Sequence, residues 1–195
     1  MGLVFIDSYS LPKINRREVL RYAGIRANGV VSDELLSHLD RAIELMIDKL
    51  SPRVCYTELP LNALDFGESS DIKKNLRNSH SVIVFAATLG IELDRLITRY
   101  EVLSPSIALL LESLGNERIE ALCDAFCESK RKEKAIFGES LRPRFSAGYG
   151  DLPLEYQKTV FDILDPSSRV GITLNDSYLM SPSKSVTAFI GIEKI

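Results

Sequence analysis

The chain has 195 residues, of which 45% are hydrophobic and 26% are charged, as is usual for one globular domain with its own core. The net charge is −3, which argues against a nucleic-acid-binding function, because that function usually requires a basic surface. No run of 18 apolar residues is present, and the first residues lack the basic region of a signal peptide, so we expect a cytoplasmic protein without a membrane span.

The first third of the chain predicts two helices. Residues 1–6 are apolar and suit an edge strand or a docked tail, two possibilities that the sequence leaves open. Residues 15–24 predict a short helix. Residues 32–50 predict a longer amphipathic helix, because apolar side chains recur there at steps of three and four and Ser32 is a good N-cap.

The next segments alternate between strands and helices. Residues 53–59 have strand composition, and residues 70–76 suit a short helix. Residues 79–88 contain a nearly continuous apolar run at 81–88, as in a strand that is buried on both faces. A helix is predicted over 91–100. The turn at 88–90 is either a ligand site at a helix start or a plain cap, and the plain cap is the more common of the two.

A long helical pattern follows, from Ser104-Pro105 to about residue 138. Gly115-Asn116 interrupts this pattern, so we expect the helix to bend or break there. The charged segment at 130–134 is predicted to be solvated surface, since cations are favourable near a helix carboxyl end. A docking patch for an acidic partner is the alternative.

Metal chemistry has little support in the sequence. Cys123 and Cys127 lie four residues apart on the predicted helix, but two thiols do not complete a metal site, so we expect buried thiols. The two histidines, His38 and His80, have no partners at a ligand spacing. No catalytic triad, P-loop or dinucleotide fingerprint is evident, so we expect no catalytic residues and no metal ligands. The odd number of cysteines also argues against a disulfide framework.

The last part of the chain contains a loop and then a helix and two strands. Residues 142–151 have loop composition, residues 154–164 predict a helix, and residues 170–174 and 185–192 predict strands. Because helices and strands do not alternate strictly and strands cluster late, we expect one α+β domain over residues 1–195. Its sheet should be twisted, mainly antiparallel and flanked by helices.

The loop carries side chains suited to a small ligand. Arg144 offers a donor fork for a carboxylate or phosphate, Gly148 allows close approach to the backbone, and Tyr149 has an apolar face with a polar tip. Composition alone still favours a purely structural turn.

Four motifs in this region carry a family resemblance. They are R-x-S-x-G-Y-G-D at 144–151, P-L-x-x-Q at 153–157, V-G-I-x-L-N-x-S at 170–177 and M-x-P-x-K-S-V-T at 180–187. Together they resemble the activation domain of cobalamin-dependent methionine synthase, especially its stand-alone form. Weaker similarity occurs in A-T-L-G-x-x-L-D-R at 87–95 and I-E-A-L-C-D-A-F at 119–126.

The resemblance implies an S-adenosylmethionine site in the loop, with an arginine on the ligand's carboxylate. The positions it assigns to the site are Arg144, Ser146, Ala147, Gly148, Tyr149 and Asp124. Asp124 stands where the family enzyme has a glutamate, and a solvated acid on a helix face is an equal alternative. The resemblance also implies that the turn Met180–Ser185 faces either the ligand or the cobalamin partner. By residue type alone, Met180 is a gap filler and Pro182 a turn former.

The function implied by the resemblance is reductive activation of a corrinoid protein. A flavodoxin-like or other reductase would supply an electron to cob(II)alamin, and this protein would present S-adenosylmethionine for methyl transfer to cobalt. Cobalamin would be held by methionine synthase modules acting in trans, because the chain has no room for them. Two alternatives remain: a non-catalytic S-adenosylmethionine-binding scaffold or sensor, and a methyltransferase for an unrelated small substrate.

Overall fold

The structure is a computed structural model that describes residues 3–25, 29 and 31–195. Its α-helices are α1 (Arg16–Tyr22), α2 (Asp33–Ile47), α3 (Ser70–Asn75), α4 (Glu92–Leu103), α5 (Pro105–Ala135), α6 (Gln157–Leu164) and α7 (Pro166–Val170). Short 3-10 helices are η1 (Leu61–Ala63) and η2 (Leu154–Tyr156). The strands are β1 (Phe5–Asp7), β2 (Arg53–Pro60), β3 (Ser81–Thr88), β4 (Glu139–Leu141), β5 (Thr173–Leu174), β6 (Met180–Ser181) and β7 (Ser185–Lys194).

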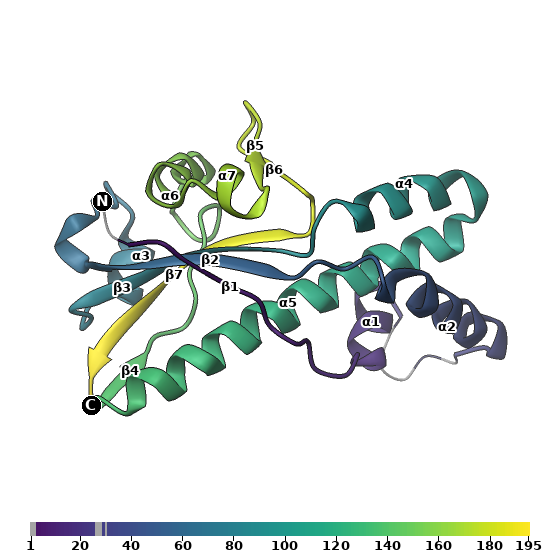
Figure 1. The fold of residues 1–195 in the computed structure, drawn as a ribbon, viewed down its shortest axis with the longest axis horizontal. Coiled ribbons are helices and arrows are strands. Elements are labelled where there is room, and N and C mark those ends of the chain that lie inside the picture. Colours follow the sequence, from purple (N-terminus) through teal and green to yellow (C-terminus); the bar gives the residue numbers. More distant parts are fainter. Residues whose placement is uncertain (1–2, 26–28, 30) are drawn as a thin grey trace.

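The main sheet is antiparallel throughout, with five strands in the order β1-β2-β3-β7-β4 within the described residues. Helices cover both of its faces (Figure 1), so the predicted α+β fold with an antiparallel sheet is confirmed. The first residues form an edge strand, as Ile6 pairs with Cys55. Residues 1–2 of the predicted segment lie outside the described residues.

Strand β3 lies in the middle of the sheet and is buried on both faces, as predicted. Alternate residues of a strand point to opposite faces. One set joins a core with α1, α2, α4 and α5: Ile83, Phe85 and Ala87. The other set joins a core with α3, α6 and α7: Val82, Val84 and Ala86. In Figure 1 the long helix α5 crosses one side of the sheet, and α6 and α7 lie on the other.

The two predicted amino-terminal helices are confirmed together with their caps. Asn15 accepts a hydrogen bond from the backbone nitrogen of Glu18 (3.4 Å), and Ser32 accepts one from that of Leu35 (3.2 Å). These bonds satisfy backbone donors that have no partner within the helix. Both helices pack on the first half of α5, at the end of the molecule away from β4 (Figure 1).

The expected bend at Gly115 is wrong, because α5 runs unbroken through it. A Cβ atom at this position would lie 2.8 Å from Cε of Lys184 and 3.0 Å from Cδ2 of Leu93. The glycine therefore makes room for Lys184, and tertiary packing outweighs its helix-propensity cost of about 1 kcal/mol. In the described part of the chain, neither α5 nor any other helix is long and apolar enough to span a membrane.

The expectation of a solvated segment at 130–134 is wrong for Lys130, which is only 6% exposed. Its Nζ donates to the hydroxyl of Tyr56 (2.7 Å) and to Glu133 (2.9 Å), and lies 4.1 Å from the centre of the Tyr56 ring. The aliphatic stem of a lysine can lie along apolar surface while its charged end reaches a polar partner. Strand β2 supplies that partner, which the sequence around Lys130 does not indicate.

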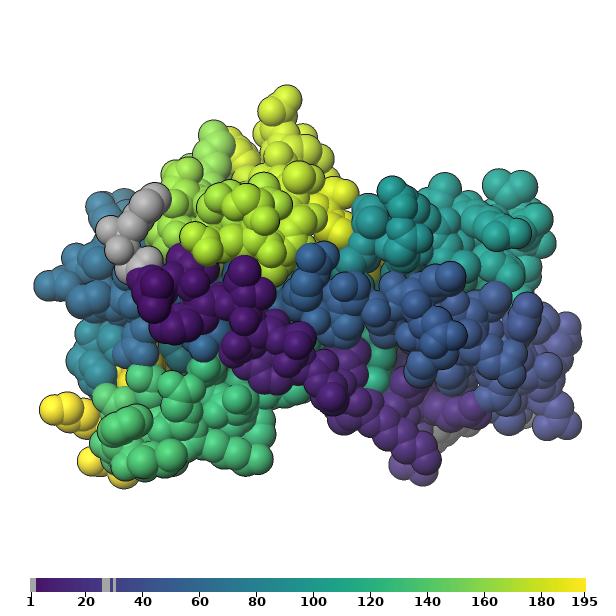
Figure 2. All heavy atoms as spheres, viewed as in Figure 1, coloured from purple at the N-terminus to yellow at the C-terminus, as the bar shows by residue number. Residues whose placement is uncertain are grey.

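The strand predicted at 170–174 is largely replaced by other structure. Val170 ends α7, and Gly171 follows in the left-handed conformation (φ 74°), which terminates the helix. Only Thr173–Leu174 forms a strand, and it pairs with Met180–Ser181 in a small hairpin outside the main sheet. Figure 2 shows this hairpin standing out from the α6–α7 layer. The strand predicted at 185–192 is confirmed as β7.

Candidate functional site

The loop at 142–151 begins by extending the sheet along β7. Arg142 donates its backbone N–H to the carbonyl of Gly191 (2.8 Å). Phe145 then exchanges two backbone hydrogen bonds with Phe189 (2.9 and 2.8 Å). Beyond Phe145 the loop leaves the strand and turns back, with Gly148 at a φ of 87°, a conformation that favours glycine. The edge of β7 next to residues 185–187 therefore borders a hollow, because the loop does not pair there.

The far end of the loop is attached to α3 through Asp151. Its carboxylate accepts hydrogen bonds from the hydroxyl of Ser69 (2.5 Å), from the backbone and hydroxyl of Ser70 (2.7 and 2.8 Å) and from the backbone of Asp71 (3.1 Å). Asp71 in return accepts the backbone N–H of Asp151 (3.2 Å). The hydrogen bond from Ser69 is the largest of several that hold the pKa of Asp151 well below its usual range. We call Asp151 together with residues 69–71 the α3 latch.

Arg144 lies where the loop passes α5. Its Nη2 donates to Glu120 (3.1 Å) and Asp124 (2.9 Å), which are one helical turn apart. The guanidinium side chain is 26% exposed. Behind it lie Cys123 and Cys127, both buried as predicted. Burial raises the pKa of Cys123 to about 12, although Arg144 acts in the opposite direction, so this thiol is protonated at neutral pH and is no nucleophile.

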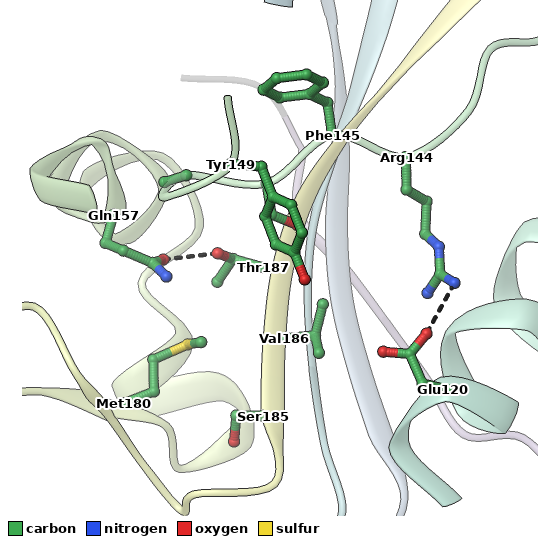
Figure 3. Close-up of a pocket in the computed structure, with 11 residues that line it drawn as sticks. Glu120, Arg144, Phe145, Tyr149, Gln157, Met180, Ser185, Val186 and Thr187 are labelled. Carbon is green, nitrogen blue, oxygen red and sulfur yellow. Dashed lines mark hydrogen bonds and ion pairs between the residues drawn. The ribbon is translucent and has the colours of Figure 1, made fainter. Parts of the chain in front are cut away.

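The loop, α5, α6, β6 and β7 line a cavity of about 480 Å³ that is open on one side. Its volume is in the range of small-molecule sites. The side chains that line it are Glu120, Arg144, Phe145, Ser146, Ala147, Tyr149, Gln157, Met180, Ser185, Val186 and Thr187. Figure 3 shows Arg144 and Glu120 on one side of β7, Gln157 and Met180 on the other, and Tyr149 between them. The cavity therefore has a charged end and an uncharged end.

The uncharged end contains a buried pair of polar side chains. Gln157, the first residue of α6, is 4% exposed, and Thr187 on β7 is 2% exposed. The Thr187 hydroxyl donates to Oε1 of Gln157 (2.6 Å). Buried polar groups normally have partners, and this bond provides one for the amide oxygen. In Figure 3 the amide oxygen faces Thr187, and the Nε2 group lies on the side of the amide nearer Met180.

Most of the residues that the resemblance assigns to the site come together in the structure. Arg144, Ser146, Ala147 and Tyr149 all line the cavity, and Gly148 forms the turn between them. Asp124 does not line it: its side chain is 74% exposed and pairs with Arg144 from outside the cavity.

Sequence reasoning missed five residues of the cavity wall, of which Phe145 and Val186 are apolar and Glu120, Gln157 and Thr187 are polar. Glu120 lies one turn before Asp124 on the same helix and supplies the acidic group of the wall. The i, i+4 spacing of the two acids was the only signal for it. Gln157 belongs to the P-L-x-x-Q motif and Thr187 to M-x-P-x-K-S-V-T, but no pattern in the sequence indicated that they form a pair.

The turn Met180–Ser185 has two roles in the structure. Met180 and Ser185 line the cavity. The residues between them attach the turn to the helices: Ser183 donates its backbone N–H and hydroxyl to Asp94 on α4 (2.7 and 2.9 Å), and Lys184 pairs with Glu112 on α5 (2.7 Å). The turn is thus held against the α4–α5 pair while its ends face the cavity.

Comparison with known proteins identifies the family. The family model described as "Vitamin B12 dependent methionine synthase, activation domain" matches residues 69–194. These residues include the loop, the α3 latch and every residue that lines the cavity. No curated protein matches the chain.

A similarity to solved structures agrees with this match. One of them is a crystal structure of the MetH reactivation domain bound to AdoHcy, with a TM-score of 0.69 and 14% sequence identity. The similarity covers 97% of this chain and 78% of the other chain, and at this identity it shows that the fold is shared. With the family model matching well over half of its length, the chain belongs to the family of the activation domain of vitamin B12-dependent methionine synthase.

Proposed function

We propose that this protein binds S-adenosylmethionine in the cavity between the loop, α5, α6 and β7, and presents its methyl group to a corrinoid on a separate protein. The observation that carries the proposal is the position of Arg144 and Glu120 side by side at one end of a cavity of suitable size. The AdoHcy ligand of the structurally similar MetH domain supports the same class of ligand.

The charged end of the cavity suits the amino-acid part of S-adenosylmethionine. Arg144 is a donor fork for the α-carboxylate, and Glu120 is an acceptor for the α-ammonium group. In the structure the two side chains pair with each other (3.1 Å), so neither charge is left unpartnered in the wall. Binding exchanges this pair for two pairs with the ligand, which lowers the cost of removing the charges from water.

The chemistry that the proposal requires is methyl transfer from sulfur to reduced cobalt. The S–CH₃ bond breaks and its electron pair stays on sulfur, while cobalt(I) supplies the pair for the new bond. This reaction needs no acid or base from the protein, because the sulfonium is already a good leaving group. The contribution of this chain is to hold the methyl group in line with the partner's cobalt. Tyr149, which is 68% exposed at the cavity, lies where the ligand and the partner would meet.

The first test is calorimetric titration of the purified protein with S-adenosylmethionine, alone and with a cobalamin-loaded methionine synthase module. We expect binding in both cases. With a flavodoxin-like or other reductase present, we also expect methylcobalamin to form, which its absorption spectrum detects. Absence of binding in both titrations would refute the proposal.

A non-catalytic S-adenosylmethionine-binding scaffold that docks to a corrinoid protein is the second candidate. The same experiment separates the two functions. Binding with no methylcobalamin under reducing conditions would favour the scaffold. Methylcobalamin formation that depends on this protein, and that disappears in the Arg144→Ala variant, would favour the activation function.

A further inference from the structure

We propose that Gln157 determines specificity by donating a hydrogen bond from Nε2 to a ring nitrogen of the ligand's purine base, with Thr187 fixing the orientation of the amide. This inference rests on the proposed function and extends it, because it assigns the uncharged end of the cavity to the nucleoside half of S-adenosylmethionine.

The Gln157 amide has one hydrogen-bonding group occupied and one available. The residue is 4% exposed, yet it lines the cavity. Its oxygen is occupied by the Thr187 hydroxyl at 2.6 Å. Within residues 3–25, 29 and 31–195, no protein group accepts a hydrogen bond from Nε2. Nε2 is not one of the fully buried side-chain atoms that lack a partner, so it is accessible from the cavity that Gln157 lines. A ligand that supplies an acceptor there can therefore take a hydrogen bond from it.

The uncharged end of the cavity presents a hydrogen-bond donor to a ligand. An amide whose oxygen is already bonded to Thr187 presents only a donor. It therefore favours an acceptor on the ligand, such as an unprotonated ring nitrogen of a purine. Met180 lines the same end, and a thioether makes favourable contacts with aromatic rings. A flat, aromatic group that bears acceptors fits both residues.

The two ends of the cavity lie on opposite sides of β7. Figure 3 shows Arg144 and Gln157 on opposite sides of β7. If the α-carboxylate of the ligand pairs with Arg144, the nucleoside must extend across the strand toward Gln157. The two residues then contact different halves of one molecule. Binding of ligand fragments can therefore measure the contribution of each residue separately.

The test is calorimetry with two ligands, S-adenosylmethionine and 5′-methylthioadenosine, which has the nucleoside but lacks the amino-acid part. Gln157→Glu replaces the donor by an acceptor of the same shape, and glutamate is well tolerated in the first turn of a helix. We expect this change to weaken 5′-methylthioadenosine by about 10- to 100-fold. S-adenosylmethionine should also bind more weakly, but by a smaller factor, because the new carboxylate attracts its sulfonium cation. Arg144→Ala should weaken S-adenosylmethionine while leaving 5′-methylthioadenosine unchanged.

Thr187→Val provides a second variant, since valine has the same shape and suits a strand. It leaves Gln157 in place but removes the hydroxyl that orients it, so we expect a smaller loss, about 3- to 10-fold, for both ligands. Asn175→Asp is the matched control, because it makes the same amide-to-acid change in the exposed β5–β6 turn. Circular dichroism checks that each variant is folded.

The outcomes separate this inference from the proposed function. If the wild-type protein binds S-adenosylmethionine and folded Gln157→Glu binds both ligands as tightly as the wild type, the inference is wrong and the proposed function stands. A loss for S-adenosylmethionine but not for 5′-methylthioadenosine also overturns it, because Gln157 would then contact the amino-acid half. If the wild-type protein binds neither ligand, both the inference and the proposed function fail.

Discussion

Arg144 connects three features of the structure at the scale of single residues. It belongs to the loop that continues the sheet, it pairs with Glu120 and Asp124 on α5, and it lies at one end of the cavity. Its guanidinium is held between two carboxylates, and a hydrogen bond between charged groups is stronger than one between neutral groups. A ligand carboxylate must therefore compete with these acids, and the geometry of the donor fork decides how well it does so.

We predict that Arg144→Ala weakens S-adenosylmethionine binding by about 2–3 kcal/mol, roughly 30- to 150-fold. Arg144→Lys should recover only part of this loss, because lysine lacks the planar fork. Calorimetry on both variants measures the effect. Arg131→Ala, which removes an exposed arginine on α5, is the control and should bind as the wild type does. Unchanged binding in folded Arg144→Ala would remove this residue from the site.

At the scale of elements, the loop is a short segment held at both ends. Its first part is paired with β7 through Phe145, and its last part is held by the α3 latch through Asp151. Gly150 lies beside the latch at a φ of 54°, and a Cβ there would collide with the carboxylate of Asp71. Because both ends are fixed, the residues between them can line the cavity with little loss of entropy when a ligand binds.

We predict that Asp151→Asn loosens the loop, because asparagine can accept fewer of the hydrogen bonds offered by α3. The affinity for S-adenosylmethionine should fall several-fold, roughly the cost of one neutral hydrogen bond. Amides of α3 and of the loop should exchange faster with solvent. Hydrogen exchange and calorimetry measure these effects. Unchanged exchange of the amides of α3 and of the loop in the variant would contradict a role of Asp151 in holding the loop.

The latch also has a predicted pH dependence. Its hydrogen bonds keep the pKa of Asp151 in the folded state below the value in the unfolded chain, which is about 3.9. The stabilisation is therefore complete well above that value and declines as the pH falls toward the folded-state pKa. We expect a lower melting temperature for Asp151→Asn than for the wild type at pH 7. The difference should shrink progressively below about pH 4.

At the scale of the whole molecule, one sheet is shared by two hydrophobic cores. Phe85 on β3 is fully buried in the core under α5, with its ring centre 4.7 Å from that of Phe126. Phe189 on β7 is fully buried in the core under α6 and packs against Phe66. Because the same strands form the floor of both cores, loss of one removes the support of the other. We therefore interpret residues 1–195 as one domain that unfolds as a unit.

We predict that Phe85→Ala destabilises the protein by about 3–5 kcal/mol. Urea unfolding followed by circular dichroism and by tyrosine fluorescence should give one coincident transition, both in the wild type and in the variant. Phe137→Ala removes the same side chain at an exposed position (72%) and should change stability little. Two separate transitions would show that the cores are independent units.

The sequence predicted most of the elements and the loop in which we place the candidate site. Apolar periodicity predicted α2 and α5, and a nearly continuous apolar run predicted the doubly buried β3. Capping residues predicted where helices begin. All of these signals depend on neighbours only a few residues apart. The cluster of small and polar residues at 142–151 predicted the loop for the same reason. The order of strands late in the chain was enough to favour an antiparallel α+β fold.

Tertiary structure alone decided which side chains meet. It made Gly115 a point of close packing for Lys184 rather than a bend, and it buried Lys130 against Tyr56. It also turned Glu120 toward the cavity in place of Asp124, and it paired Gln157 with Thr187 from different elements. Each of these contacts joins residues that are far apart in the chain or on adjacent turns of one helix. Their position depends on how helices and sheet pack, which local patterns in the sequence do not encode.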